Sequence, residues 1–70
     1  MRPDPVLVAA LERECRAGGD RVGIIMCQIA RGKYDWADIG DRRFDVLDAY
    51  AEVERMLAEA AAEYGVEPEE

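Results

Sequence analysis

Four residue types that carry much of protein chemistry are missing from this chain. Its 70 residues include no His, Ser, Thr or Asn, and Lys33 is the only lysine. The sequence therefore lacks the hydroxyl nucleophiles of Ser and Thr, and it lacks the imidazole that serves as a general base and as a metal ligand. It also offers no acceptor for Ser/Thr phosphorylation or N-glycosylation. We therefore expect a protein that is not an enzyme and that uses no cofactor.

A metal site is the next class to be tested, because aspartates are frequent between residues 35 and 48. An EF-hand loop beginning at Asp35 would place Gly40 correctly at its sixth position. Ala37, Ile39 and Val46 would however stand where oxygen ligands are required. A di-iron site in a helix bundle needs Glu-x-x-His pairs, which a chain without histidine cannot supply. The sequence therefore predicts no metal site.

Long hydrophobic runs are also absent. The longest uncharged run covers residues 22–30, whereas a membrane-spanning helix needs about 20 apolar residues. An acid and two prolines occupy the N-terminus, where a signal peptide would have a basic and then an apolar stretch. Cys15 and Cys27 are predicted to be buried, reduced thiols whose sulfurs lie too far apart for a disulfide. These features predict a cytoplasmic protein.

The remaining composition predicts an all-α fold, a small three-helix bundle, with one domain over residues 1–66 and an acidic tail over residues 67–70. Asp4 followed by Pro5 is a strong signal for a helix start, and the glycine pair 18–19 should end that helix. In this helix we expect Leu7, Val8, Leu11 and Cys15 to face the core, and Glu12, Arg13 and Arg16 to face outward.

A second helix over residues 21–31 should be the central one, because it is apolar on almost every side. Asp20 is its expected N-cap, and Gly32 should end it. Gly23 is costly inside a helix, so its expected role is to allow a neighbouring element to pack closely. Residues 33–40 are expected to form a connection that holds at most one helical turn, capped by Asp35.

A long third helix is predicted from Asp41, as its N-cap, to about Tyr64, with Gly65 as its stop. Successive residues of a helix are rotated by about 100°, so one line along this helix contains mostly acidic residues. The opposite line contains apolar residues that should face the core. The acidic line contains Asp41, Asp45, Asp48, Glu52, Arg55, Glu59 and Glu63. The core line contains Val46, Tyr50, Val53, Leu57, Ala60 and Tyr64.

Charge is divided unevenly along the chain. Residues 1–33 carry six basic and four acidic side chains, and residues 34–70 carry three basic and twelve acidic ones. Like charges one turn apart destabilise a helix, and a face that only confers solubility usually mixes signs. The acidic line could still be an ordinary solvated face. We interpret it instead as a surface that repels nucleic acid and membranes and attracts basic protein surfaces.

Tyr34 and Trp36 form an aromatic pair flanked by aspartates. Trp and Tyr are enriched at the energetic centres of interfaces, so the pair could anchor a partner. The interpretation that the sequence favours is that Trp36 closes the end of the bundle between the second and third helices.

A second type of interface is predicted on the C-terminal turns of the third helix. The first two helices are too short to cover the whole third helix, so apolar surface is left exposed at its C-terminal end. A second copy of the chain would cover that surface most simply. The residues expected in this interface are Met56, Leu57, Ala58, Ala61 and Ala62.

The leading hypothesis for function is a small acidic interaction protein that occupies a basic, nucleic-acid-binding surface of another protein. In size, charge and helicity, the chain is similar to the acidic inhibitors with which phages block host nucleic-acid machinery, such as anti-CRISPR proteins, although it shares no motif with them. The expected partner-binding residues are Tyr34, Asp35, Trp36, Asp38, Asp41, Asp45, Asp48, Glu52 and Glu59.

Two alternatives remain open. One is a homo-oligomeric assembly or adaptor module that uses the apolar flank of the third helix. The other, which the sequence favours less, is a small DNA-binding regulator that uses the basic N-terminal half through Arg13, Arg16, Arg21 and Arg31, although the acids at residues 35–41 would oppose binding by a helix-turn-helix.

Overall fold

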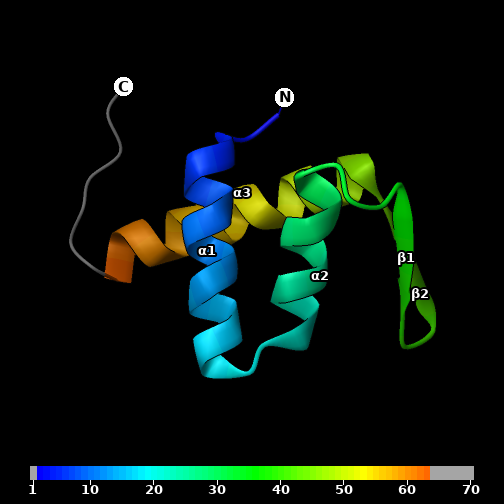
Figure 1. Cartoon of the computed structure of the whole chain (residues 1–70), viewed down its shortest axis with the longest axis horizontal. Coiled ribbons are helices and arrows are strands. Elements are labelled where there is room, and N and C mark those ends of the chain that lie inside the picture. Colours follow the sequence, from blue (N-terminus) through cyan, green and yellow to red (C-terminus); the bar gives the residue numbers. More distant parts are fainter. Residues whose placement is uncertain (1, 64–70) are drawn as a thin grey trace.

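The computed structural model describes residues 2–63 and contains three helices and one β-hairpin within that range (Figure 1). The elements follow in the order α1 (Pro5–Gly18), α2 (Arg21–Ala30), β1 (Trp36–Ile39), β2 (Arg42–Asp45) and α3 (Val46–Glu63). The predicted tail at residues 67–70, the predicted core position Tyr64 and the predicted stop at Gly65 lie outside the described residues.

Helices α1 and α2 form an antiparallel helical hairpin whose ends follow the sequence signals. The Asp4 carboxylate accepts a hydrogen bond from the Val6 N–H at 2.9 Å, and Asp20 caps α2 by accepting from the Gly23 N–H at 3.0 Å. Gly19 ends α1 in the left-handed conformation with φ of 73°. The predicted caps and the predicted glycine stop of α1 are therefore confirmed.

Gly23 lies at a close approach between α1 and α2. A Cβ added at this position would lie 2.6 Å from Cys15 Sγ and 2.6 Å from Asp20 Oδ2. Any side chain at this position would force Cys15 or Asp20 to shift, so the predicted role of Gly23 in close packing is confirmed.

The prediction of an all-α bundle is wrong, because residues 36–45 form a two-stranded antiparallel sheet. Ile39 pairs with Arg42, so Gly40 and Asp41 form the two-residue turn between the strands. Gly40 has φ of 67° and Asp41 has no positive φ, which is the pattern of a type II′ turn. A two-residue Gly-Asp turn between alternating apolar and polar residues is a hairpin signal, and it outweighs the single helical turn that was expected here.

The predicted start of the last helix at Asp41 is also wrong, because the hairpin includes this residue. Asp41 lies in the hairpin turn and does not cap α3, which begins at Val46. Asp45 and Asp48 form a reciprocal cap: the Asp48 N–H donates to Asp45 Oδ1 at 3.0 Å, and the Asp45 N–H donates to Asp48 Oδ2 at 3.3 Å. The pair resembles a capping box, in which two free N–H groups of a helix start are satisfied together.

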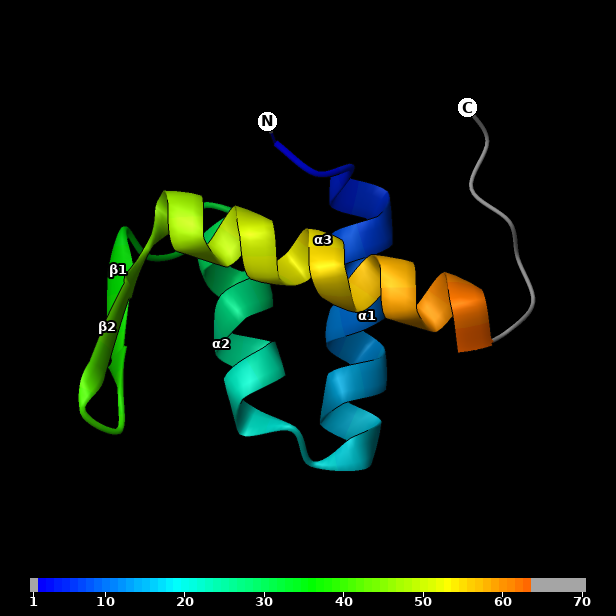
Figure 2. The same ribbon diagram turned by 180° about the vertical axis from the view of Figure 1, so that it is seen from behind.

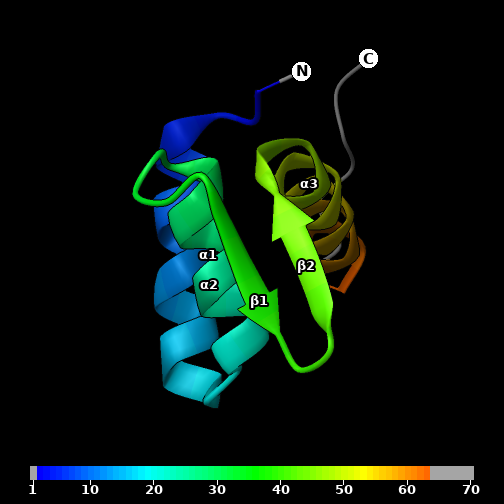
Figure 3. The same cartoon turned by 90° about the vertical axis from the view of Figure 1, so that its right-hand side faces the viewer.

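Helix α3 crosses the α1–α2 hairpin instead of running alongside it, as Figure 2 shows from behind. Its Ala49 and Val53 are fully buried against α1 and α2, and the β-hairpin lies beside α2 and α3 at one end of the molecule (Figure 3). Of the predicted core line, Val53 is buried, and Val46, Tyr50 and Leu57 pack partly buried against the core. The other core residues are Val8, Leu11, Cys15, Met26, Cys27, Ile29 and Ala30.

Glu12 departs from its prediction, because it is buried although it was expected to face outward. It retains 7% of its surface and links α1 to the end of α2. Its carboxylate accepts hydrogen bonds at 2.8 Å from Arg16, one turn along α1, and at 2.8 Å from Arg31, which follows α2. Burial alone would raise the pKa of Glu12, but the hydrogen bonds and charges of the two arginines outweigh burial and lower it.

Cys15 and Cys27 are free and buried, as expected, but their thiols lie nearer to each other than the predicted helix register implied. Each thiol influences the pKa of the other through a direct side-chain interaction. The close approach of the helices at Gly23 explains the error, because Cys27 lies one turn beyond Gly23 on the same side of α2. Burial raises the pKa of the Cys27 thiol to about 12.

Candidate protein-interaction surface

The β-hairpin presents one face to the core and the other to solvent. Ala37, Ile39 and Phe44 are half-buried and pack against the core. Because directly opposed residues of an antiparallel pair lie on the same side, the register Trp36↔Asp45 and Asp38↔Arg43 places these four residues together on the other side. All four are exposed, and we call Trp36, Asp38, Arg43 and Asp45 the outer hairpin face.

The centre of the outer hairpin face is a stacked pair. The Arg43 guanidinium carbon lies 4.3 Å from the centre of the Trp36 ring, within the range of a cation–π interaction. Trp36 is 47% exposed, so the favoured interpretation, in which it closes the end of the bundle, is wrong. Arg43 holds one side of the indole and leaves Trp36 oriented on an otherwise open surface.

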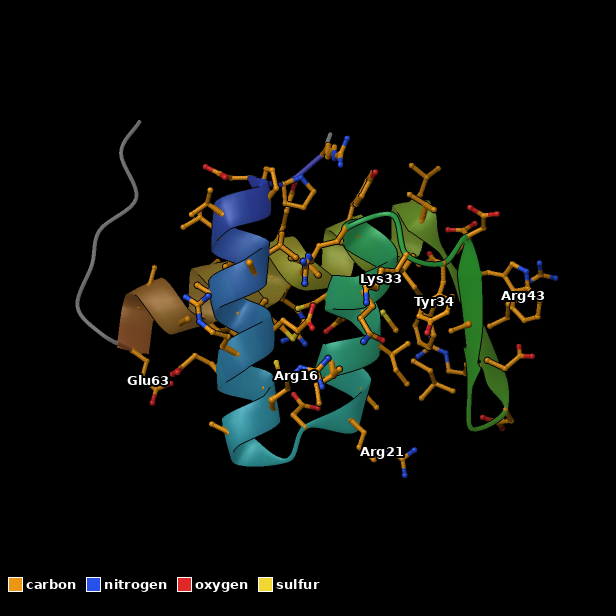
Figure 4. The ribbon with its side chains drawn as sticks, viewed as in Figure 1. Arg16, Arg21, Lys33, Tyr34, Arg43 and Glu63 are labelled. Carbon is orange, nitrogen blue, oxygen red and sulfur yellow. The ribbon has the colours of Figure 1, made fainter. Side chains whose placement is uncertain are left out.

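Further predicted partner-binding residues lie at the same end of the molecule. Tyr34, 53% exposed, precedes β1, and Figure 4 shows it between α2 and the hairpin, with Arg43 on the outer side of the strands. Asp35 is exposed next to it, and Asp41 is exposed at the turn. The structure therefore brings Tyr34, Asp35, Trp36, Asp38, Asp41 and Asp45 to one end of the molecule.

Beyond the hairpin, the acidic line on the last helix is shorter than predicted, and part of its negative charge is neutralised by an arginine. Its first member on α3 is Asp48, because Asp41 and Asp45 precede the helix. Arg55 forms ion pairs with both Glu52 and Glu59, and these contacts raise the pKa of the Arg55 guanidinium. Figure 4 shows Glu63 at the end of α3 away from the hairpin. The acids with most effect on a partner of the hairpin are therefore those from Asp35 to Asp48.

The predicted oligomer interface is divided between the core and solvent. Met56 and Leu57 are half-buried and pack against the core, so they are largely covered within one chain. Ala61 is half-buried, and Ala58 and Ala62 are exposed. The largest exposed apolar side chain of α3 is Leu47, at 71% exposure, which was not among the predicted interface residues.

The basic residues considered for DNA binding are partly occupied. Arg16 and Arg31 both bind Glu12 and are only 54% and 39% exposed. Arg13 and Arg21 are exposed on α1 and at the start of α2. This half of the molecule therefore offers less free positive charge than the sequence indicates.

Arg43 is the residue of the outer hairpin face that the sequence prediction missed. The signal was present in the Gly40–Asp41 turn, because a hairpin centred there pairs Arg43 with Asp38 and places both beside Trp36. Because this segment was expected to lead into a helix, its side chains were not assigned to the alternating sides of a strand. The placement of Arg43 and Trp36 on one side was therefore not predicted.

Neither a metal site nor a membrane-spanning helix is found among the described residues. Among residues 2–63, no group of three or more Cys, Asp or Glu side chains is arranged to hold a metal ion. No helix in this part of the chain combines the length and apolar content needed to cross a bilayer. Comparison with protein-family profiles, with curated proteins and with solved structures found no match, so the surface is interpreted from its own residues.

Proposed function

We propose that this chain is a small, non-enzymatic interaction protein that acts in the cytoplasm and occupies a basic, nucleic-acid-binding surface of a partner protein. The observation that carries the proposal is the outer hairpin face, where an exposed Trp36 is held by Arg43 and bordered by Asp38 and Asp45. The contact surface is centred on the hairpin and reaches Asp48 on α3.

The composition of this face supports a protein partner. Trp, Tyr and Arg are the residue types most often found to dominate binding energy, and they act best when packed and surrounded by a polar rim. Trp36 supplies a large apolar surface whose orientation is already fixed, so less rotamer freedom is lost when it is covered. The face thus has the anchor and the rim of a specific interface.

The charge supports a basic partner surface. Five aspartates, namely Asp35, Asp38, Asp41, Asp45 and Asp48, accompany two arginines of the hairpin, and the chain carries a net charge of −7. Such a field accelerates association with positive surfaces and disfavours contact with nucleic acid itself. A groove that normally binds phosphates carries positive charge and is therefore complementary in sign to these aspartates. The proposed action is therefore inhibition by mimicry of nucleic acid.

The test begins with purified, tagged chain incubated with lysate of its source cell and eluted with a salt gradient. Captured proteins are then purified and assayed for nucleic-acid binding with and without the chain. The proposal expects competition that weakens as salt rises, and loss of both capture and competition in the double variant Asp38→Lys, Asp41→Lys. Glu63→Lys, at the far end of α3, is the matched control and should behave like the wild type. Capture and competition that the double reversal leaves unchanged would refute the proposal.

One observation favours a second candidate, the assembly module. Leu47 is 71% exposed on α3, and Ala51, Ala58 and Ala62 are exposed along the same flank. This apolar flank would be covered in a homodimer in which α3 packs against α3. Sedimentation equilibrium separates the candidates: the assembly module predicts a dimer that Leu47→Lys converts to a monomer, whereas the inhibitor proposal requires no such dimer.

A further inference from the structure

We propose that Cys15 and Cys27 are a dithiol site that hydroperoxides oxidise to an intramolecular disulfide linking α1 to α2. The proposal is independent of the partner surface, because the pair lies in the core between the two helices. It requires that the two sulfurs meet and that one of them can be reached by a small oxidant.

The first condition follows from the packing at Gly23. Cys15 Sγ occupies the space in which a Cβ of residue 23 would stand, at 2.6 Å from that point. Cys27 is four residues further along α2, and residues at this spacing lie on the same face of a helix. Cys15 therefore faces the side of α2 that carries Cys27, and the interaction between the thiols agrees with this placement.

The second condition is met unequally by the two thiols. Cys15 retains 7% of its surface, close to the Gly18–Gly19 end of α1, whereas Cys27 is completely buried. We infer that hydrogen peroxide, as a small oxidant, reaches Cys15 more readily than Cys27. Cys15 is therefore the residue that is oxidised first, and Cys27 is the residue that resolves the intermediate.

The chemistry balances with one equivalent of peroxide. The Cys15 thiolate attacks a peroxide oxygen, the O–O bond breaks, and the departing hydroxide takes up a proton, leaving a sulfenic acid and one water. The Cys27 sulfur then attacks the Cys15 sulfur, an S–S bond forms, and the sulfenic hydroxyl leaves as a second water. The two thiols lose two electrons in total, and the peroxide gains them. Burial raises the pKa of both thiols, so the reaction is expected to be slower than at an activated cysteine.

The test uses the full, reduced chain treated with hydrogen peroxide and analysed by intact mass and by non-reducing peptide mapping. The expected product has lost two hydrogens, and trypsin should release residues 14–16 joined to residues 22–31. A sulfenic-acid trap should label Cys15 in Cys27→Ala but not in the wild type, where Cys27 captures the intermediate. The oxidised chain should also unfold at higher urea than the reduced chain, because a cross-link restricts the unfolded state.

Three results would overturn the proposal. The first is a native chain that peroxide leaves reduced while the urea-unfolded chain is converted to the disulfide. The second is a wild type in which trapped sulfenic acid accumulates at Cys15 to the same extent as in Cys27→Ala. The third is a product made of disulfides between chains, which would show that the two sulfurs do not meet within one molecule. Circular dichroism of Cys27→Ala confirms that its labelling is measured on a folded chain.

Discussion

The buried carboxylate of Glu12 gives the most direct test of how this small core is held together. Glu12→Gln keeps the shape of the side chain and removes its charge. The change weakens three charge-assisted hydrogen bonds, two from Arg16 within α1 and one from Arg31 that joins the end of α2 to α1. We therefore expect a loss of folding stability without a loss of fold.

The magnitude follows from the exposure of the partners. A hydrogen bond to a charged group contributes about 1.5–3 kcal/mol when it is well buried. Arg16 and Arg31 are however 54% and 39% exposed, so water competes for both guanidiniums. An exposed pair one turn apart contributes only about 0.3–0.5 kcal/mol, and glutamine avoids the cost of burying a charge. The expected net loss is about 1 kcal/mol, or about 4–8 °C in Tm for a domain of this size.

The pH dependence provides an independent check on the same residue. The pKa of Glu12 is lowered from its ordinary value of 4.5, so its contribution to stability is complete above that value and is lost as the pH falls through the lower folded pKa. The difference in stability between wild type and Glu12→Gln should therefore be largest at neutral pH and should shrink below pH 4.5.

Urea unfolding followed by circular dichroism, repeated between neutral and acidic pH, measures both effects. Glu54→Gln, an exposed carboxylate on α3, is the matched control and should change stability by less than about 0.5 kcal/mol. A Glu12→Gln chain that is as stable as the wild type at neutral pH would refute the reasoning, since it would mean that the cost of burying the charge cancels its pairing.

Three further substitutions test the turns and the packing, each by urea unfolding. Gly23→Ala should destabilise the chain by about 1–3 kcal/mol, because the new Cβ would overlap Cys15 Sγ and this overlap outweighs the better helix propensity of alanine. Equal or higher stability of the variant would contradict the close packing at this position. Asp45→Ala should cost about 1 kcal/mol, because it removes the acceptor of the Asp48 N–H at the start of α3; helix content should fall with it. Gly40→Val should cost at least about 1–2 kcal/mol, because a β-branched residue is strained at φ of 67°, and an unchanged midpoint would argue against the type II′ turn.

The ends of α1 and the start of α2 could be predicted because their signals are local. Asp4, Asp20 and the glycine pair act on backbone groups within three residues of themselves, so their effect does not depend on what packs around them. The hairpin was equally local but was not found, since the aspartates around it fit a helical period as well as they fit a turn. Gly40 before Asp41 is the feature that distinguishes the two structures.

By itself, the sequence determined the absence of Ser, Thr and His, the excess of acids in the second half and the helical hairpin of the first half, because composition and caps need no partner. Only the tertiary structure decided that Glu12 is buried between two arginines, that Cys15 Sγ packs against α2 beside Gly23 and that Trp36 lies open beside Arg43. These relations depend on how closely α1 approaches α2 and on how α3 crosses both. Such distances arise from the packing of segments far apart in the chain, which no local pattern specifies.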